Sequence, residues 1–377
     1  MARVLAILLA LSACLGCTRE PEPLKIGAVL SITGPAAYLG EPEKNTLLML
    51  QEEANARGGV GGHKVELVIY DDGSDVSSAI QSATRLIEED RVAVVIGPST
   101  SGNTLAVRQL FAPARIPLVS CAASERIVKP VDPWVFSTPQ LDRAAVTKIL
   151  ADARRKGYAK LASISSADGF GQSGRAVLQE LVRAQELALV ADEVYGPSDT
   201  DVSVQLGRIR DAAPDALICW GIGPGPVTVA RTRAQMGLAI PLYMSHGVAS
   251  PKFIEQAGES AEGVMLPAGR LAVVDQVPSG HPQKALLAAY SQRYAQKYGT
   301  PPTTFGGYAF DAFMLVATAV QAGKSVKPQD IRDNLERTKG LAGTSGIFTM
   351  STADHNGLDE GAFLLVAVAG GQWKVLD

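Results

Sequence analysis

Residues 92–124, VAVVIGPSTSGNTLAVRQLFAPARIPLVSCAAS, are the stretch that decides the fold. Residues 92–96 form a continuous apolar run that ends in a Gly-Pro pair, which is the pattern of a strand covered on both faces in a parallel sheet. Residues 116–119 repeat this pattern in a shorter form. The helical stretch between them, residues 102–111, completes a strand-helix-strand unit, which predicts an α/β fold.

A hydroxyl-rich loop follows each of these strands. The first loop holds Ser99, Thr100 and Ser101, and the second is residues 120–124, SCAAS. A hydroxyl residue before a helix is first of all an N-cap, but three in succession at a helix N-terminus also suit an anion. Ligands of open α/β sheets bind at the carboxyl ends of the strands. Because neither loop contains an acidic or basic residue, we expect these loops to hold a carboxylate rather than to react with one.

The strand-helix unit recurs from residue 24 and starts again after Pro139, which predicts two lobes, each on a doubly wound parallel sheet. The helices after residue 281 lack enough strands for a third lobe and are predicted to cover the first one. The last strands, at residues 346–350, 362–368 and 372–376, are predicted to return to the second. The predicted N-terminal lobe is residues 24–141 plus 268–342, and the predicted C-terminal lobe is residues 142–267 plus 343–377. Three crossings between the lobes predict a hinge.

The N-terminal segment is predicted to be a signal peptide. Residues 1–17, MARVLAILLALSACLGC, have the basic start, short apolar run and small-residue end of an export signal. Residues 11–14, LSAC, resemble a bacterial lipobox, so we expect cleavage before Cys14 and lipid attachment to this residue, with Cys17 as the alternative. Residues 18–23 are then a tether. The other interpretation is an ordinary secreted protein with an accidental cysteine at this place.

Several classes of function are disfavoured. The net charge of −3 gives no reason to expect nucleic acid as a partner. The chain lacks a Gly-x-Ser-x-Gly motif and a Gly-rich phosphate loop, and of its four His residues only His246 is predicted to lie at a cleft. We therefore expect neither an enzyme nor a cofactor. Asp71, Asp72 and Asp75 are interpreted as caps rather than metal ligands.

Several short motifs occur in a fixed order along the chain, at residues 33–40 (TGPAAYLG), 70–72 (YDD), 96–98 (IGP), 168–174 (DGFGQSG), 257–263 (AGESAEG) and 308–312 (YAFDA). With these motifs the chain resembles the extracytoplasmic solute-binding proteins of ABC transporters, in the type I branched-chain amino-acid-binding family and its lipoprotein form. The resemblance implies capture of a small ligand by hinge closure and delivery to an ABC permease and ATPase. It also implies a location in the periplasm or at the cell surface, anchored to a membrane by the N-terminal lipid.

The resemblance also implies the binding-site residues. The ligand carboxylate is expected at the two hydroxyl-rich loops, which contribute Ser99, Thr100, Ser101, Ala122, Ala123 and Ser124. The body of the ligand is expected to contact Tyr38, Leu39, Phe170, Trp220, Gly221, Ile222, His246 and Tyr308.

One position departs from the family pattern. Amino-acid binders of this family carry an acid, which pairs with the ligand ammonium, where this chain has His246. A neutral imidazole supplies no negative charge, and a buried ammonium without a counter-ion is costly. The sequence therefore favours a carboxylate without an amino group, on an aromatic or other organic body. Two alternatives stay open: a branched-chain or related amino acid, with Asp142 supplying the charge, and a ligand-sensing receptor of the same fold.

Overall fold

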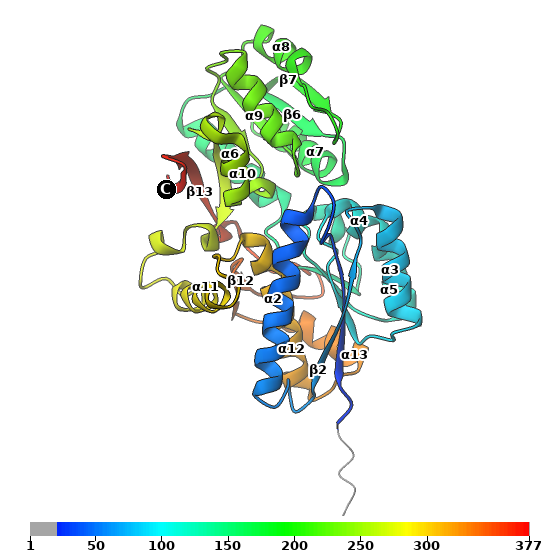
Figure 1. Ribbon diagram of the computed structural model, residues 1–377. Helices are drawn as coiled ribbons and strands as arrows, with labels where there is room; N and C mark the ends of the chain where they lie inside the picture. The colour runs from blue at the N-terminus through cyan, green and yellow to red at the C-terminus, as the bar shows by residue number, and fades with distance from the viewer. Residues whose placement is uncertain (1–20, 377) are drawn as a thin grey trace, which may run out of the picture.

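The computed structural model describes residues 21–376, which form two α/β lobes, one above the other in Figure 1. The predicted signal peptide, both candidate lipid-attachment cysteines and residues 18–20 of the predicted tether lie outside the described residues. The two lobes confirm the predicted fold class, and the arrangement of their strands determines where the cleft between them lies.

The first lobe contains a five-stranded parallel sheet in the order β2-β1-β3-β4-β5. Its strands are β1 (Leu24–Leu30), β2 (Val65–Asp71), β3 (Val94–Ile96), β4 (Leu118–Ser120) and β5 (Val135–Ser137). Every residue of β3 and β4 is buried, as expected for strands covered on both faces. Because the strands are parallel, the hydroxyl-rich loops after β3 and β4 lie at the same edge of the sheet.

Helices cover both faces of this sheet, because neighbouring residues of a strand point to opposite faces. On one face, Val29 and Val95 pack with α3 (Val76–Glu88), α4 (Ser101–Val107) and α5 (Phe111–Ala114). On the other face, Ile26 packs in a core with α2 (Ala37–Ala56), α11 (Lys284–Tyr298), α12 (Thr304–Gly323) and α13 (Pro328–Glu336). The three late helices therefore lie in the first lobe.

Helix α12 lies at the centre of this core. Among the described helices it alone is long and apolar enough to cross a membrane, but 78% of its 18-residue apolar window is buried within the protein. Its apolar character follows from this burial, since it packs along α2 and α13.

The second lobe contains a mixed seven-stranded sheet in the order β14-β13-β10-β9-β8-β6-β7. Five of its strands are parallel: β6 (Lys160–Ser166), β7 (Ala188–Tyr195), β8 (Ala216–Trp220), β9 (Leu242–Met244) and β10 (Met265–Gly269). The faces are covered by α6 (Asp142–Arg155), α7 (Gly169–Ala184), α8 (Ser203–Asp211), α9 (Gly225–Gln235) and α10 (Pro251–Ala257). The last strands complete the sheet as an antiparallel pair, β13 (Phe363–Ala369) and β14 (Gln372–Val375), with β13 antiparallel to β10.

The prediction that residues 346–350 return to the second lobe is wrong. Strand β12 (Ile347–Phe348) pairs with β11 (Leu341–Ala342) in a separate two-stranded sheet. Phe348 and Met350 are fully buried in the core of the first lobe. A short apolar pattern indicates a strand but does not specify its partner.

Three segments connect the lobes, after β5, after β10 and after β12, which confirms the predicted three-strand hinge. Asn356 Nδ2 of the segment after β12 donates to the carbonyl of Pro139 in the segment after β5 (2.8 Å). Gln140 Nε2 of the segment after β5 donates to the carbonyl of Ser345, between β11 and β12 of the first lobe (2.8 Å). Asp311 of α12 accepts a hydrogen bond from the backbone N–H of Ser345 (2.8 Å). The hinge is therefore hydrogen-bonded both within itself and to the first lobe.

Candidate functional site

A small cavity lies between the lobes, at the carboxyl ends of β3, β4, β8 and β9. Its lining residues are Leu39, Ser99, Thr100, Ser101, Cys121, Ala122, Ala123, Phe170, Ile222, His246, Gly247, Phe305 and Tyr308. Ten of the fourteen predicted site residues are in this set, whereas Tyr38, Ser124, Trp220 and Gly221 are not. The cavity volume is ≈ 30 Å³, far below the roughly 300–1,000 Å³ of ordinary ligand pockets. An organic ligand therefore needs the lobes to separate in order to enter.

Two hydroxyls on the first-lobe side can donate into the cavity. Thr100 is the N-cap of α4, and its Oγ1 accepts a hydrogen bond from the backbone N–H of Asn103 (3.3 Å). Ser101 Oγ accepts one from the backbone N–H of Ser124 (3.3 Å). A hydroxyl has one hydrogen to donate as well as its acceptor lone pairs. Because these oxygens are already used as acceptors, both side chains are suited to donate to an anion.

The hydroxyl of Ser99 has a different role. It donates to the carboxyl group of Glu43 and accepts from the backbone N–H of Ser31 (3.0 Å). Glu43 is fully buried, and this burial raises the pKa of its carboxyl well above the usual range. Ser99 therefore connects the loop after β3 to α2, although it also lines the cavity.

In the second loop, most of the predicted carboxylate donors are already paired. The backbone N–H of Ala122 donates to Ser120 Oγ (3.1 Å). Ser124 Oγ donates across the cleft to Ser173 Oγ of α7 (2.7 Å), and Ser173 Oγ donates to Asp142 Oδ2 (2.5 Å). Ser124 is therefore a contact between the lobes rather than part of the cavity wall.

Asp142 does not provide a counter-ion for an ammonium group in this arrangement. It is fully buried and does not line the cavity. Burial raises the pKa of its carboxyl to about 8, although the hydrogen bond from Ser173 opposes this shift. The group is therefore mainly protonated at neutral pH, and its second oxygen, Oδ1, has no hydrogen-bond partner.

His246 faces the cavity from the loop after β9. It is 2% exposed, and neither ring nitrogen has a hydrogen-bond partner. Burial lowers the pKa of the imidazole to about 3, so the ring is neutral at physiological pH. The rings of Phe170 and Phe363 pack around it, with centroid distances of 5.4 Å and 5.2 Å.

Trp220 and Gly221 lie behind the cavity wall. Trp220 is fully buried in the core of the second lobe, with its ring centroid 5.8 Å from that of Phe170. A Cβ atom on Gly174 of α7 would lie 2.0 Å from Trp220 Nε1, so this glycine makes room for the indole. The carbonyl of Gly221 accepts a hydrogen bond from Ser245 Oγ (3.0 Å). Trp220 supports Phe170, which in turn lines the cavity.

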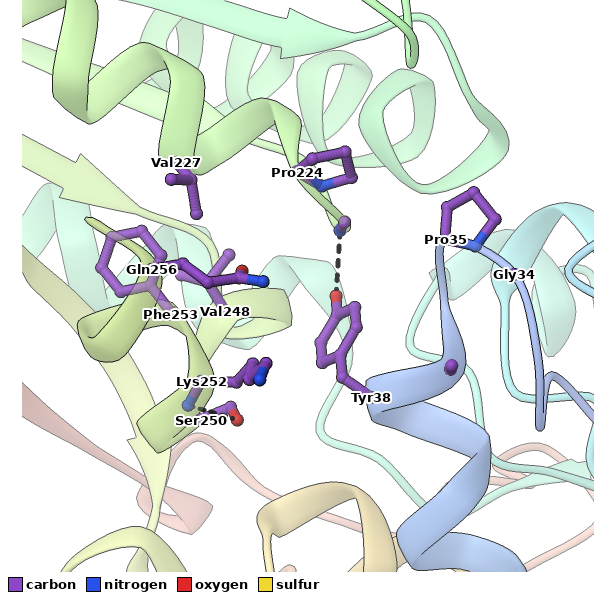
Figure 2. A pocket seen from close by; sticks show the side chains of 12 residues that line it. Gly34, Pro35, Tyr38, Pro224, Val227, Val248, Ser250, Lys252, Phe253 and Gln256 are labelled. Carbon is purple, nitrogen blue, oxygen red and sulfur yellow. Dashed lines mark hydrogen bonds between the residues drawn. The ribbon is translucent and has the colours of Figure 1, made fainter. Parts of the chain in front are cut away.

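Tyr38 joins the lobes, and Figure 2 shows the hydrogen bond between its hydroxyl and the second lobe. Its Oη accepts a hydrogen bond from the backbone N–H of Gly223 (3.1 Å) and donates to the carbonyl of Gly247 (3.1 Å). Its ring lines a second pocket, of ≈ 310 Å³, together with Phe253 and Lys252 of the second lobe. The neighbouring residue, Leu39, lines the inner cavity.

Phe305, Cys121 and Gly247 were not among the predicted contacts. Phe305 stands in the first turn of α12, three residues before Tyr308, and the two ring centroids are 5.9 Å apart. This spacing on a helix is visible in the sequence and could have identified Phe305. Cys121 is free and buried, and so is Cys219.

The wall of the cavity contains no Asp, Glu, Lys or Arg among the described residues. Within residues 21–376 there is also no group of three or more His, Cys, Asp or Glu side chains that could hold a metal ion. The cavity thus combines hydroxyl donors from the first lobe, apolar and aromatic walls, and a neutral imidazole from the second lobe.

Known proteins share this architecture. The family model described as "Periplasmic binding protein" matches residues 23–372. The Leu/Ile/Val-binding protein of Escherichia coli is 24% identical over 276 residues, covering 72% of this chain and 74% of that protein. A leucine-, isoleucine-, valine-, threonine- and alanine-binding protein of Pseudomonas aeruginosa is 23% identical over 318 residues, covering 83% of this chain and 82% of that protein.

Solved structures agree with this relationship. An extracellular ligand-binding receptor from Rhodopseudomonas palustris HaA2 has a TM-score of 0.88 at 29% identity, covering 94% of this chain and all of that chain. The branched-chain amino acid transporter substrate binding protein LivJ of Streptococcus pneumoniae, in complex with isoleucine, has a TM-score of 0.82 at 25% identity, covering 94% of this chain and 98% of that one. The chain therefore belongs to the periplasmic binding protein family and has its two-lobed type I fold.

Proposed function

We propose that this protein is the substrate-binding component of an ABC importer of the branched-chain amino-acid type, and that it captures a small carboxylate without an ammonium group. The lobes close around the ligand, and the closed protein delivers it to the permease. The observation that carries the proposal is the composition of the cavity wall. The described residues that line it offer hydroxyl donors and include no Asp or Glu.

The first-lobe side of the cavity supports a carboxylate. The hydroxyls of Thr100 and Ser101 accept hydrogen bonds from backbone N–H groups and retain their own hydrogens for donation. Hydrogen bonds to a charged oxygen contribute about 1.5–3 kcal/mol each. Two such donors can hold a carboxylate without a nearby cation.

The second-lobe side supports the absence of an ammonium group. His246 is buried and neutral, with its pKa lowered to about 3, and the pKa of Asp142 is raised to about 8. A ligand ammonium would lose its hydration without meeting a negative charge, at a cost of several kcal/mol. Rings from Phe170, Phe305 and Tyr308 line the same cavity, so an aromatic or other organic acid suits its walls.

A branched-chain amino acid is the second candidate, because several relatives carry names that state this ligand. Thermal unfolding of residues 18–377 separates the two candidates, since a ligand that binds only the folded state raises the melting temperature. We expect benzoates, hydroxycinnamates or short aliphatic acids to raise it and leucine, isoleucine and valine to leave it unchanged. Stabilisation by these amino acids alone would contradict the proposed ligand class.

We also propose that the protein acts outside the cytoplasm, attached to a membrane by a lipid at Cys14. The support is the signal-like pattern of residues 1–17 and the LSAC sequence at residues 11–14. Mass spectrometry of the mature N-terminus tests this. We expect a lipid-modified peptide that begins at Cys14. A lipid-modified peptide that begins at Cys17 would assign the lipid to Cys17 instead, and an unmodified N-terminus would contradict the proposed lipid anchor.

A further inference from the structure

We infer that the ligand is a hydroxy acid whose hydroxyl group forms a hydrogen bond with His246, in addition to the carboxylate held by the first lobe. This inference rests on the proposed function, because it assigns the ligand of the same cavity more narrowly. It makes His246 the residue that determines specificity.

The first step is the state of the imidazole. Among the described residues that line the cavity, His246 alone has buried side-chain polar atoms without a hydrogen-bond partner. Both ring nitrogens lack a hydrogen-bond partner, and the residue is only 2% exposed to solvent. Leaving a buried donor or acceptor unpaired is unfavourable, so a partner from the cavity would stabilise the site.

The second step is that the described side chains packed against the imidazole are aromatic rings, and none of them forms a hydrogen bond with it. Aromatic rings surround the imidazole, with centroid distances of 5.4 Å to Phe170, 5.9 Å to Trp220 and 5.2 Å to Phe363, all edge-on. These contacts hold the ring in place by packing. Because His246 lines the cavity and makes no hydrogen bond to the described residues, a group bound in the cavity can supply its partner.

The third step is the chemistry of that partner. A neutral imidazole has one N–H donor and one nitrogen acceptor, and burial keeps this ring neutral by lowering its pKa to about 3. A hydroxyl group can pair with either nitrogen, because it both donates and accepts. An ammonium would meet no negative charge, since the described residues of the cavity wall include no charged side chain. A second carboxylate would receive only the single N–H of the neutral ring. A hydroxyl group therefore satisfies His246 at either nitrogen without burying a charge.

Isothermal titration calorimetry with matched ligands tests the inference. One pair, 4-hydroxybenzoate and benzoate, places a hydroxyl far from the carboxylate. The other pair, 2-hydroxy-4-methylpentanoate and 4-methylpentanoate, places it next to the carboxylate, and leucine carries an ammonium at that same carbon. We expect the hydroxylated member of at least one pair to bind about ten times more tightly, and His246→Phe to reduce this preference to about twofold or less. His246→Gln, which keeps a neutral hydrogen-bonding group, should preserve part of the preference.

The outcomes are distinguishable. Equal binding within both pairs, or a preference that persists in a folded His246→Phe variant, overturns the inference and leaves the proposed function standing. Tighter binding of leucine than of every acid, or no binding of any acid, overturns the proposed function and the inference with it. A third measurement is independent of any variant: in protein labelled with ¹⁵N at its four His residues, the preferred hydroxy acid should shift the ring nitrogen signals of His246, and its hydroxyl-free partner should not. Identical shifts with both ligands overturn the inference.

Discussion

The hydroxyl of Tyr38 in the first lobe lies 3.1 Å from the backbone nitrogen of Gly223 in the second lobe and accepts its hydrogen bond (Figure 2). The same hydroxyl donates to the carbonyl of Gly247, also at 3.1 Å. One side chain thus joins two loops of the opposite lobe. Both bonds exist only while the lobes are together, so Tyr38 stabilises the closed form.

Tyr38→Phe is expected to speed ligand release. The variant keeps the ring and loses both interlobe hydrogen bonds, each contributing about 0.5–1.5 kcal/mol, so we expect an affinity loss of about tenfold, mainly through faster dissociation. Stopped-flow displacement measures the dissociation rate. The matched control is Tyr298→Phe, which loses a hydrogen bond to the carbonyl of Asn45 within the first lobe. Equal dissociation rates in wild type and Tyr38→Phe would show that this contact does not limit opening.

Thr100→Val is expected to weaken carboxylate binding about tenfold or more, because the variant keeps the size of the side chain and removes the hydroxyl that donates to the ligand. It also removes the N-cap of α4, whose Oγ1 accepts from Asn103. Asp75→Ala, which removes the N-cap of α3, is the control for the loss of stability alone. Calorimetric titration with unchanged affinity in Thr100→Val would contradict the assignment of this hydroxyl to the carboxylate.

The strands and the position of the cavity follow from local patterns that are visible in the sequence. The strand-helix unit was predicted to recur from residue 24, and β1 begins there, because a buried strand of a parallel sheet is a nearly continuous apolar run. The hydroxyl-rich loops lie at the cavity for a similar reason, since parallel strands bring their carboxyl ends to one edge. Such features depend on neighbours in the sequence.

The direction of a side chain at a strand end depends on distant residues instead. Trp220 was predicted to contact the ligand, but the indole turns into the core because Gly174, 46 residues earlier, leaves room for it. Tyr38 was predicted in the ligand wall, but its hydroxyl pairs with Gly223 and Gly247, which approach only when two lobes meet. No local periodicity contains this information.

Gly174→Ala is expected to destabilise the second lobe. The added Cβ would lie 2.0 Å from Trp220 Nε1, so the indole must move and push on Phe170, and overpacking of this kind costs about 1–3 kcal/mol. The control is Gly207→Ala in α8, where the added Cβ meets nothing within 4 Å and the helix should gain about 0.5–1 kcal/mol. Urea unfolding compares the two. If both substitutions changed stability alike, Gly174 would have no special role in seating the indole.

The buried carboxyl of Asp142 is expected to make the protein less stable as the pH rises. Burial raises its pKa from 3.8 to about 8, so between these values the folded state retains a proton that the unfolded chain releases. Unfolding therefore becomes more favourable with rising pH, by up to about 1.4 kcal/mol per pH unit from this one group. His246 acts in the opposite direction, because its pKa is lowered from 6.5 to about 3 and its contribution to stability is lost as the pH falls through this range.

Asp142→Asn separates the two effects, because the amide cannot ionise and keeps an oxygen to accept from Ser173. Relative to wild type, we expect the free energy of unfolding of this variant to rise steadily between pH 5 and pH 8, which urea titrations at several pH values can measure. The difference between the two proteins cancels the titration of His246 and of every other shared group. Parallel curves for the variant and wild type would mean that Asp142 is ionised in the folded state, which would contradict the raised pKa.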